Sequence, residues 1–302
     1  MIEFRNLTKR FGAKLALDNL SFTAVPGHVT GFLGPNGSGK TTTMRILLGL
    51  EFATSGVALI DGEPYGQITN PLFKVGALLD ARNAHPGRSG FDHLRALALT
   101  HGISNDRVEF VLEEVGLSGV ASRRVGGYSL GMRQRLGIAA SMLGDPAVYV
   151  FDEPVNGLDP DGVIWFRELV TSFAAEGKTV LLSSHLISEV ALTADHVIIV
   201  GRGTVIADSQ LSELARVHGA ERVIVRSEQA HELVKPLEAA GASIAADGGA
   251  LIVEGLTAAE VGAQVARLGI PLSELRTHIE SLEDTYRQLT DSSVEYRTGS
   301  YR

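Results

Sequence analysis

The chain has 302 residues, of which 44% are hydrophobic, with a formal net charge of −8 and no cysteine. This length and apolar content can bury a sizeable core and suggest two domains, while the missing cysteines exclude disulfides and thiolate metal sites. The acidic balance argues against a nucleic-acid partner, because phosphate backbones require a basic surface.

The first 33 residues alternate short strands with turns, and the last of these strands is apolar and ends at Leu33. A helical pattern from Thr42 to Leu50 follows a short loop. The loop reads Gly34-Pro35-Asn36-Gly37-Ser38-Gly39-Lys40-Thr41 and fits the pattern G-x-x-x-x-G-K-[ST] between a strand and a helix.

Glycines in such a loop let successive backbone N–H groups point at phosphate oxygens, and the helix adds its positive N-terminal end. We therefore predict that this loop, together with Thr42, binds a nucleoside triphosphate. Lys40 is expected to reach the β- and γ-phosphates, and the Thr41 hydroxyl is expected to hold Mg²⁺.

The next segments predict an antiparallel layer and a helical region. Residues 55–60 form an apolar strand that an Asp-Gly turn ends at Gly62, which suits a layer beside the nucleotide. Between Gly90 and Met142 the spacing of apolar residues is mostly helical. These apolar positions include Leu94, Leu97, Val108, Val111, Leu112 and Val115.

A second candidate half of the site begins at Ala147, where an apolar run leads into Asp152 and Glu153. Such a run reads as a buried parallel strand, whose C-terminal end delivers its carboxylates to a ligand in an open α/β sheet. Asp152 would then hold Mg²⁺, and Glu153 would polarise a water for attack on the γ-phosphate. Without the phosphate loop, two adjacent acids could equally be solvated turn residues. Strands over 179–182 and 196–200 alternate with helices and complete a parallel sheet.

After about Leu214 the pattern changes to a strand over 222–226, a helix over 228–240, strands over 242–245 and 251–254, a helix over 258–268 and a strand over 272–276. This βαββαβ order predicts a small ferredoxin-like α+β domain. A short helix over 281–290 follows, and we expect the last dozen residues to be frayed.

Three further runs accompany the two halves of the site, one between them and two after them. They are Tyr128-Ser129-Leu130-Gly131-Met132, Asn156-Gly157-Leu158-Asp159-Pro160 and Ser183-Ser184-His185. With all motifs in this order, residues 1 to about 215 resemble the ATP-binding subunits of ABC transporters. The signature loop of that family is normally Leu-Ser-Gly-Gly-Gln, so Ser129 and Gly131 match, whereas Tyr128, Leu130 and Met132 depart.

The resemblance implies roles for several residues. Ser129, Gly131 and Met132 would contact the ATP held by a second subunit, residues 157–160 would cross the dimer interface, and His185 would contact the γ-phosphate. Phe11 would stack on adenine, although a Phe before Gly is also a common core anchor. Asp80 stands where the family generally has a glutamine that bridges Mg²⁺ and the membrane partner, and Asn83 is the alternative.

The resemblance also implies the architecture and the partners. We expect an α/β P-loop NTPase fold of the ABC type over 1–215, followed by an accessory domain over 216–302 that ends in the short helix and the frayed tail. One copy of each motif implies a homodimer, or a dimer with a similar chain, that clamps two ATP molecules with Mg²⁺ and drives a separate transmembrane permease. The ending over 281–290 resembles drug- and antibiotic-exporter ATPases of the daunorubicin- and bacitracin-resistance type. An importer ATPase and a soluble, non-transport ABC ATPase remain alternatives.

The predicted location follows from the same patterns. No run of about 18 uncharged apolar residues occurs, since even the apolar stretch 179–200 is broken by His185, Glu189 and Asp195. The residues from Met1 to Arg5 contain no basic segment leading into an apolar one, so we expect no signal peptide. We expect the chain at the cytoplasmic face of the cell membrane, held there through the permease.

Overall fold

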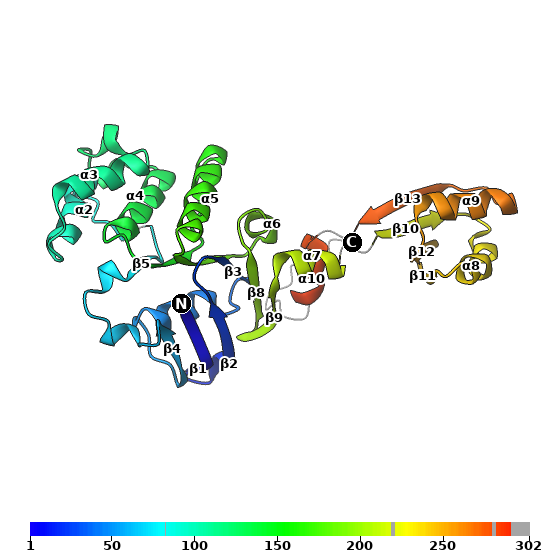
Figure 1. Ribbon diagram of the computed structural model, residues 1–302, viewed down its shortest axis with the longest axis horizontal. Helices are drawn as coiled ribbons and strands as arrows, with labels where there is room; N and C mark the ends of the chain where they lie inside the picture. Colours follow the sequence, from blue (N-terminus) through cyan, green and yellow to red (C-terminus); the bar gives the residue numbers. More distant parts are fainter. Residues whose placement is uncertain (82, 219–220, 280–281, 291–302) are drawn as a thin grey trace. The chain divides into compact units, whose positions relative to one another are not determined.

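The computed structural model describes residues 1–81, 83–218, 221–279 and 282–290 (Figure 1). Contacts between residues divide these into two compact units. The first comprises Met1–Leu211 together with the end of the last helix from Leu289, and the second comprises Ser212–Gln288. The predicted boundary between residues 215 and 216 remains a prediction, and the predicted fraying of the last dozen residues lies outside the described part of the chain.

The first unit is built on a six-stranded sheet in the order β5-β6-β7-β3-β8-β9. All pairs are parallel except β8 with β9, which is antiparallel. The strands are β3 (Val29–Leu33), β5 (Val75–Leu78), β6 (Val148–Asp152), β7 (Thr179–Ser184), β8 (His196–Gly201) and β9 (Thr204–Gln210). Every residue of β3, β6 and β7 is buried, as expected for strands of a parallel sheet that is covered on both faces.

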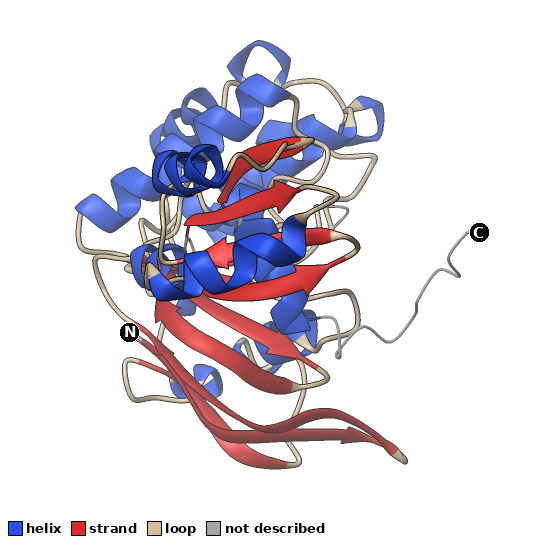
Figure 2. Cartoon of the chain, turned by 90° about the vertical axis from the view of Figure 1, so that its right-hand side faces the viewer, coloured by secondary structure: helices blue, strands red, loops and turns tan. Residues whose placement is uncertain are grey.

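Because β3, β6 and β7 are neighbours and run in the same direction, their C-terminal ends meet at one edge of the sheet. The phosphate loop leaves β3 at this edge, Asp152 ends β6 there, and His185 follows β7. The parallel topology therefore gathers motifs that are more than a hundred residues apart in the sequence. Figure 2 draws these strands in red and the helices in blue.

The predicted antiparallel layer is a three-stranded sheet in the order β2-β1-β4. Its strands are β1 (Ile2–Phe11), β2 (Lys14–Ala24) and β4 (Ser55–Ile60). Phe4, Phe22 and Phe32 join it to the parallel sheet, with ring centroids 4.5 Å apart for the first pair and 5.0 Å for the second. The two sheets thus share one apolar core.

Helix α1 (Lys40–Leu47) begins at the phosphate loop and ends three residues earlier than the sequence pattern predicts. Gly49 takes the left-handed conformation with φ of 67°, and the Leu50 N–H donates to the Arg45 carbonyl over 2.8 Å. This closing turn satisfies carbonyls that a longer helix would have used. The prediction that the helix reaches Leu50 is therefore wrong.

The helical region contains α2 (Gly90–Leu99), α3 (Asn105–Glu114) and α4 (Leu130–Met142), which pack on one another, with α4 also on β5. Ser89, Ser104 and Ser129 cap them, each accepting a hydrogen bond from a backbone N–H three residues on. The first unit also contains α5 (Pro160–Ala175) and α6 (Ile187–Val190), and α7 (Leu211–His218) begins where its main segment ends and continues into the second unit. Short 3₁₀ turns are η1 (Tyr65–Gln67), η2 (Pro71–Phe73), η3 (Ser118–Val120) and η4 (Val125–Gly127).

The second unit has the predicted βαββαβ order. It comprises β10 (Glu221–Arg226), α8 (Ala230–Ala239), β11 (Ser243–Asp247), β12 (Ala250–Glu254), α9 (Ala258–Leu268) and β13 (Glu274–Ile279), followed by α10 (Leu282–Thr290). Its antiparallel sheet has the order β11-β12-β10-β13 and carries its own apolar core. The predicted α/β class with an antiparallel layer, a helical region and a small α+β unit is confirmed. Among the described residues, no helix is long and apolar enough to cross a bilayer.

Candidate nucleotide-binding site

An open cleft of about 370 Å³ lies over the loop between β3 and α1, a volume in the usual range for small-molecule sites. Gly37 and Gly39 have φ angles of 83° and 106°, so the turn of this loop requires residues without a Cβ. The cleft is lined by Phe11, Lys14, Ala16, Asn36, Gly37, Ser38, Gly39, Lys40, Thr41, Thr42 and Glu153. Most of the predicted phosphate-binding residues therefore lie around one hollow.

Lys40 is buried at the base of this cleft. Its Nζ donates to the Gly34 carbonyl over 2.6 Å and to the Pro35 carbonyl over 3.3 Å, and it lies 3.9 Å from Oε1 of Glu153. Burial lowers the pKa of Lys40 below its usual value, while the carboxylates of Glu153 and Asp152 oppose that shift. A phosphate entering the cleft would supply a further anionic partner to a cation that is already desolvated.

Three oxygen-bearing side chains meet where α1 approaches the edge of the sheet. The Thr41 hydroxyl donates to Oδ2 of Asp152 over 2.6 Å, and the Ser183 hydroxyl donates to Oδ1 over 2.5 Å. Hydroxyl and carboxylate oxygens are the hard ligands that Mg²⁺ prefers, usually with phosphate oxygens and water. Within the described ranges, no group of three or more His, Asp or Glu side chains could hold a metal by itself. Thr41 and Asp152 thus fit a magnesium ion that completes its shell with nucleotide oxygens.

Glu153 adopts a backbone conformation that is unusual for a residue with a side chain. Its φ is 49°, in the left-handed region, which costs of the order of 1–3 kcal/mol unless neighbours enforce it. Ser183 enforces it from one side, because its Oγ accepts from the Glu153 N–H over 3.0 Å. Gln134 does so from the other, donating to the carbonyls of Glu153 over 3.3 Å and Pro154 over 2.7 Å.

The Glu153 carboxylate contacts the side chain of His185, whose Nδ1 lies 2.8 Å from Oε2. Asn156 Nδ2 also donates weakly to Oε2, over 3.4 Å. Glu153 is thereby turned toward the cleft, between Lys40 on one side and His185 on the other. A carboxylate at this position can accept a proton from a water that attacks a terminal phosphate.

The signature run lies on a different surface. Ser129 caps α4, and the Met132 N–H donates to its hydroxyl over 3.2 Å. Gly131 packs so closely that a Cβ there would lie 2.8 Å from the Gly157 carbonyl oxygen, which joins the signature run to residues 157–160. Among the described residues, the lining of the cleft includes Phe11 but not Ser129, Gly131 or Met132.

Asp80 follows β5, which pairs in parallel with β6 in the register Leu78 to Phe151. It therefore leaves the sheet at the same edge as Asp152. The Asn83 N–H bonds the Asp80 carbonyl over 3.4 Å, so both predicted alternatives belong to one turn. The roles of Asp80 as a metal ligand and as a contact to the membrane partner stay predictions.

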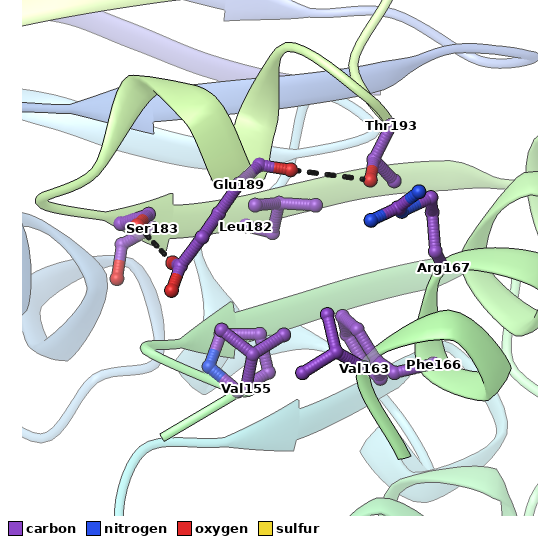
Figure 3. Close-up of a pocket in the computed structure, with 10 residues that line it drawn as sticks. Val155, Val163, Phe166, Arg167, Leu182, Ser183, Glu189 and Thr193 are labelled. Atoms are coloured by element: carbon purple, nitrogen blue, oxygen red, sulfur yellow. Dashed lines mark hydrogen bonds between the residues drawn. The ribbon is translucent and has the colours of Figure 1, made fainter. Parts of the chain in front are cut away.

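A second, smaller pocket is lined by residues that include Ser183, Ser184 and Glu189 (Figure 3). Here Ser184 donates to Oε2 of Glu189 over 2.7 Å and accepts from the Leu186 N–H over 3.0 Å, which fixes the turn that carries His185. Its volume of about 20 Å³ suits a water molecule, not a nucleotide. The larger cleft is therefore the candidate ligand site.

Comparisons with known proteins bear on this geometry. The family described as ABC transporter matches residues 17–156, and a domain of unknown function matches residues 221–283. The chain is 36% identical to the lantibiotic transport ATP-binding protein SrtF of Streptococcus pyogenes, over 70% of this chain and 91% of that protein. It is 34% identical to an uncharacterized ABC transporter ATP-binding protein, YhcH, of Bacillus subtilis, over 98% and 97% of the two chains.

A third relative is the bacitracin transport ATP-binding protein BcrA of Enterococcus faecalis, 37% identical over 71% of this chain and 70% of that protein. Among solved structures, the ATP-binding subunit of an ABC transporter superposes with a TM-score of 0.64 at 26% identity, over 72% of this chain and 93% of that one. The chain belongs to the ATP-binding proteins of ABC transporters.

Family membership identifies the chain as the ATP-hydrolysing subunit of a transporter. A dimeric ATP-binding cassette in a post-hydrolysis state, bound to ADP and Pi, shares the fold with a TM-score of 0.64 at 23% identity, over 70% of this chain and 99% of that one. The predicted resemblance to ABC ATPases and the predicted ATPase activity are confirmed.

The sequence motifs did not reveal two residues that support the site. Ser183 stands beside His185 in a quoted run, but its link to both Asp152 and Glu153 depends on the pairing of β6 with β7. Gln134 lies on α4, two residues after the signature run, and reaches back to the strand end only in the folded chain. Neither residue belongs to a sequence pattern with a mechanism of its own.

We expect Ser183→Ala to lower the turnover of ATP by about 10-fold or more while changing ATP affinity by less than about threefold. The hydroxyl holds the Asp152 carboxylate and the strained Glu153 backbone, whereas the phosphate contacts come from the loop. Steady-state hydrolysis and equilibrium binding separate the two effects. Ser172→Ala is the control, because Ser172 is exposed on α5 and bonds only the Leu169 carbonyl. Equal losses in both measurements would contradict this role.

Proposed function

We propose that this chain hydrolyses MgATP as a peripheral subunit at the cytoplasmic face of a membrane and powers the export of a drug, antibiotic or lipid-like compound through a separate permease. The 2.6 Å contact of Thr41 with Asp152 carries the hydrolytic part of the proposal, because it joins the phosphate loop to the edge that bears Glu153. The names of the lantibiotic and bacitracin relatives support the class of cargo.

In this proposal the bound nucleotide lies between Phe11, which stacks on adenine, and Lys40, which contacts the β- and γ-phosphates. The loop from Gly34 to Thr42 surrounds the phosphates, with its backbone N–H groups as donors at every residue except Pro35. Thr41 and Asp152 would hold Mg²⁺, with Asp80 as a further ligand, and the ion supplies charge neutralisation to the terminal phosphate. The buried state of Lys40 and the oxygen set around Asp152 support these assignments.

Glu153 acts as the base that orients the attacking water, and His185 contacts the γ-phosphate. Their 2.8 Å contact supports a shared function, since each side chain fixes the direction of the other. When the nucleotide arrives, Lys40 exchanges its carbonyl partners for phosphate oxygens. Lys40, Glu153 and His185 then surround the terminal phosphate.

We further propose that two copies, or this chain and a similar one, close around two ATP molecules. Ser129, Gly131 and Met132 of one subunit would complete the cleft of the other. The separation of these residues from the lining of their own cleft supports this arrangement. ATP binding would close the dimer and hydrolysis would reopen it, which delivers the movement to the permease.

The first test of this proposal is Glu153→Gln. We expect ATP binding to persist while turnover falls by at least about 10²-fold, because the amide cannot accept the proton of the attacking water. The measurements are steady-state phosphate release and equilibrium ATP binding. Glu113→Gln, at an exposed position of α3, is the control and should behave as wild type. Near-normal hydrolysis by Glu153→Gln would remove Glu153 from the mechanism.

The second test concerns the dimer. In the Glu153→Gln background, MgATP should convert monomer to dimer in light scattering, since a ligand bound between two copies stabilises the pair. Adding Ser129→Arg should prevent this by placing bulk and charge at the predicted contact with the second nucleotide. A dimer that forms regardless of ATP and of Ser129 would place the interface elsewhere.

The third test concerns coupling and begins with co-purification of the full chain with its permease. Asp80→Ala should reduce permease-stimulated hydrolysis more than basal hydrolysis, whereas Asp80→Gln should be tolerated because an amide oxygen offers the same metal contact. If Asp80 only forms the turn, both rates of Asp80→Ala stay within about twofold of wild type. Asn83→Ala would then be the variant that uncouples the two rates.

A further inference from the structure

The ring of Phe11 carries a buried ammonium group against it. Lys9 is only 8% exposed, and its Nζ lies 4.6 Å from the centroid of the Phe11 ring. The same Nζ donates to Oε1 of Glu51 over 2.8 Å and to the Phe52 carbonyl over 2.7 Å. Three contacts therefore hold this cation at one place on the ring.

The Phe11 ring has two neighbours of different kinds. It is 47% exposed and lines the nucleotide cleft, while Lys9 is absent from the described residues that line it. The ammonium group therefore contacts one face of the ring, and the ring itself is available to a ligand in the cleft. The hydrogen bond from Lys9 lowers the pKa of the Glu51 carboxyl below its usual value, which favours the ionised form of that carboxyl.

A cation on one face of an aromatic ring is attracted by the electrons of that face and draws them toward itself. The opposite face then becomes less electron-rich and stacks more favourably on a purine. The ring is also fixed in orientation, which reduces the entropy lost when a base binds.

Backbone contacts connect this arrangement to the phosphate loop. Glu51 and Phe52 follow the helix that begins at Lys40, and the Thr54 N–H donates to the Thr8 carbonyl over 2.8 Å. In return, the Arg10 N–H donates to the Thr54 hydroxyl over 2.9 Å. The strand that carries Phe11 is thereby joined to the end of α1, so the base contact and the phosphate contacts belong to one connected frame.

We infer that Lys9 is a positioning residue that orients and polarises Phe11 for stacking on the adenine base. This inference rests on the proposed stacking of adenine on Phe11. It assigns to Lys9 a selective effect on the base, with no contact to the phosphates.

The test compares the binding of ADP with that of pyrophosphate, which lacks the base, by calorimetry on the full chain. Lys9→Met and Lys9→Gln should each weaken ADP binding about 3- to 10-fold and leave pyrophosphate binding unchanged. Met retains an apolar side chain and Gln retains a polar end group, while both lack the positive charge. An equal loss of ADP affinity in the two variants therefore reports the charge of Lys9. Lys9→Arg retains a cation and should restore ADP affinity to within about twofold.

Two further variants complete the design. Lys74→Met is the matched control, because Lys74 pairs with Glu63 at an exposed site, and it should change neither affinity. Phe11→Leu should weaken ADP binding without affecting pyrophosphate, and adding Lys9→Met to it should have no further effect.

The outcomes distinguish this inference from the function on which it rests. If Phe11→Leu leaves ADP binding unchanged, the stacking itself is wrong and the inference falls with it. If Phe11→Leu weakens ADP but the neutral Lys9 variants do not, the role of Lys9 alone is overturned. Equal weakening of ADP and pyrophosphate by Lys9→Met would also overturn it, since Lys9 would then act through the phosphate loop.

Discussion

The hydrogen bonds around Asp152 determine how the rest of the site is arranged. Asp152 is 8% exposed, and its carboxylate accepts hydrogen bonds from the hydroxyls of Thr41 and Ser183. Without these two donors, burial of the carboxylate would cost free energy of folding. Thr41 comes from α1 and Ser183 from β7, so one carboxylate fixes a helix and two strands relative to each other. The parallel order β6-β7-β3 makes this possible, because it brings three strand ends to the same edge.

The position of Glu153 follows from that of Asp152. A strand that continued regularly would direct the Glu153 side chain away from the phosphate loop, and the left-handed backbone at this residue changes that direction. The strain is maintained by Ser183 and Gln134, which bond its N–H and its carbonyl. Gln134 lies on the helix that starts at the signature run. Gln134 therefore links α4, the helix of the predicted dimer surface, to the backbone of the proposed base Glu153.

The sequence was sufficient to predict features that depend on local pattern. The phosphate loop, the buried run before Asp152 and the βαββαβ order all follow from spacing and residue type, and the structure has them. The end of α1 was misplaced because the apolar pattern continues through Leu50, while Gly49 ends the helix earlier. Ser183, Gln134 and Lys9 could not be assigned, since their partners come from other strands and helices. The roles of Asp80 and of the signature run stay predictions, because they concern groups outside a single chain.

The second unit contributes no residue to the proposed ATP site. Each residue of the proposed ATP site lies within Met1–Leu211, and the second unit has a separate sheet and core. The match with the Streptococcus pyogenes relative covers 91% of that protein but only 70% of this chain, so nearly all of that protein aligns with part of this one. The Bacillus subtilis relative, in contrast, matches 98% of this chain. The two relatives thus differ in how much of this chain they match, and the residues of the proposed ATP site all belong to the first unit.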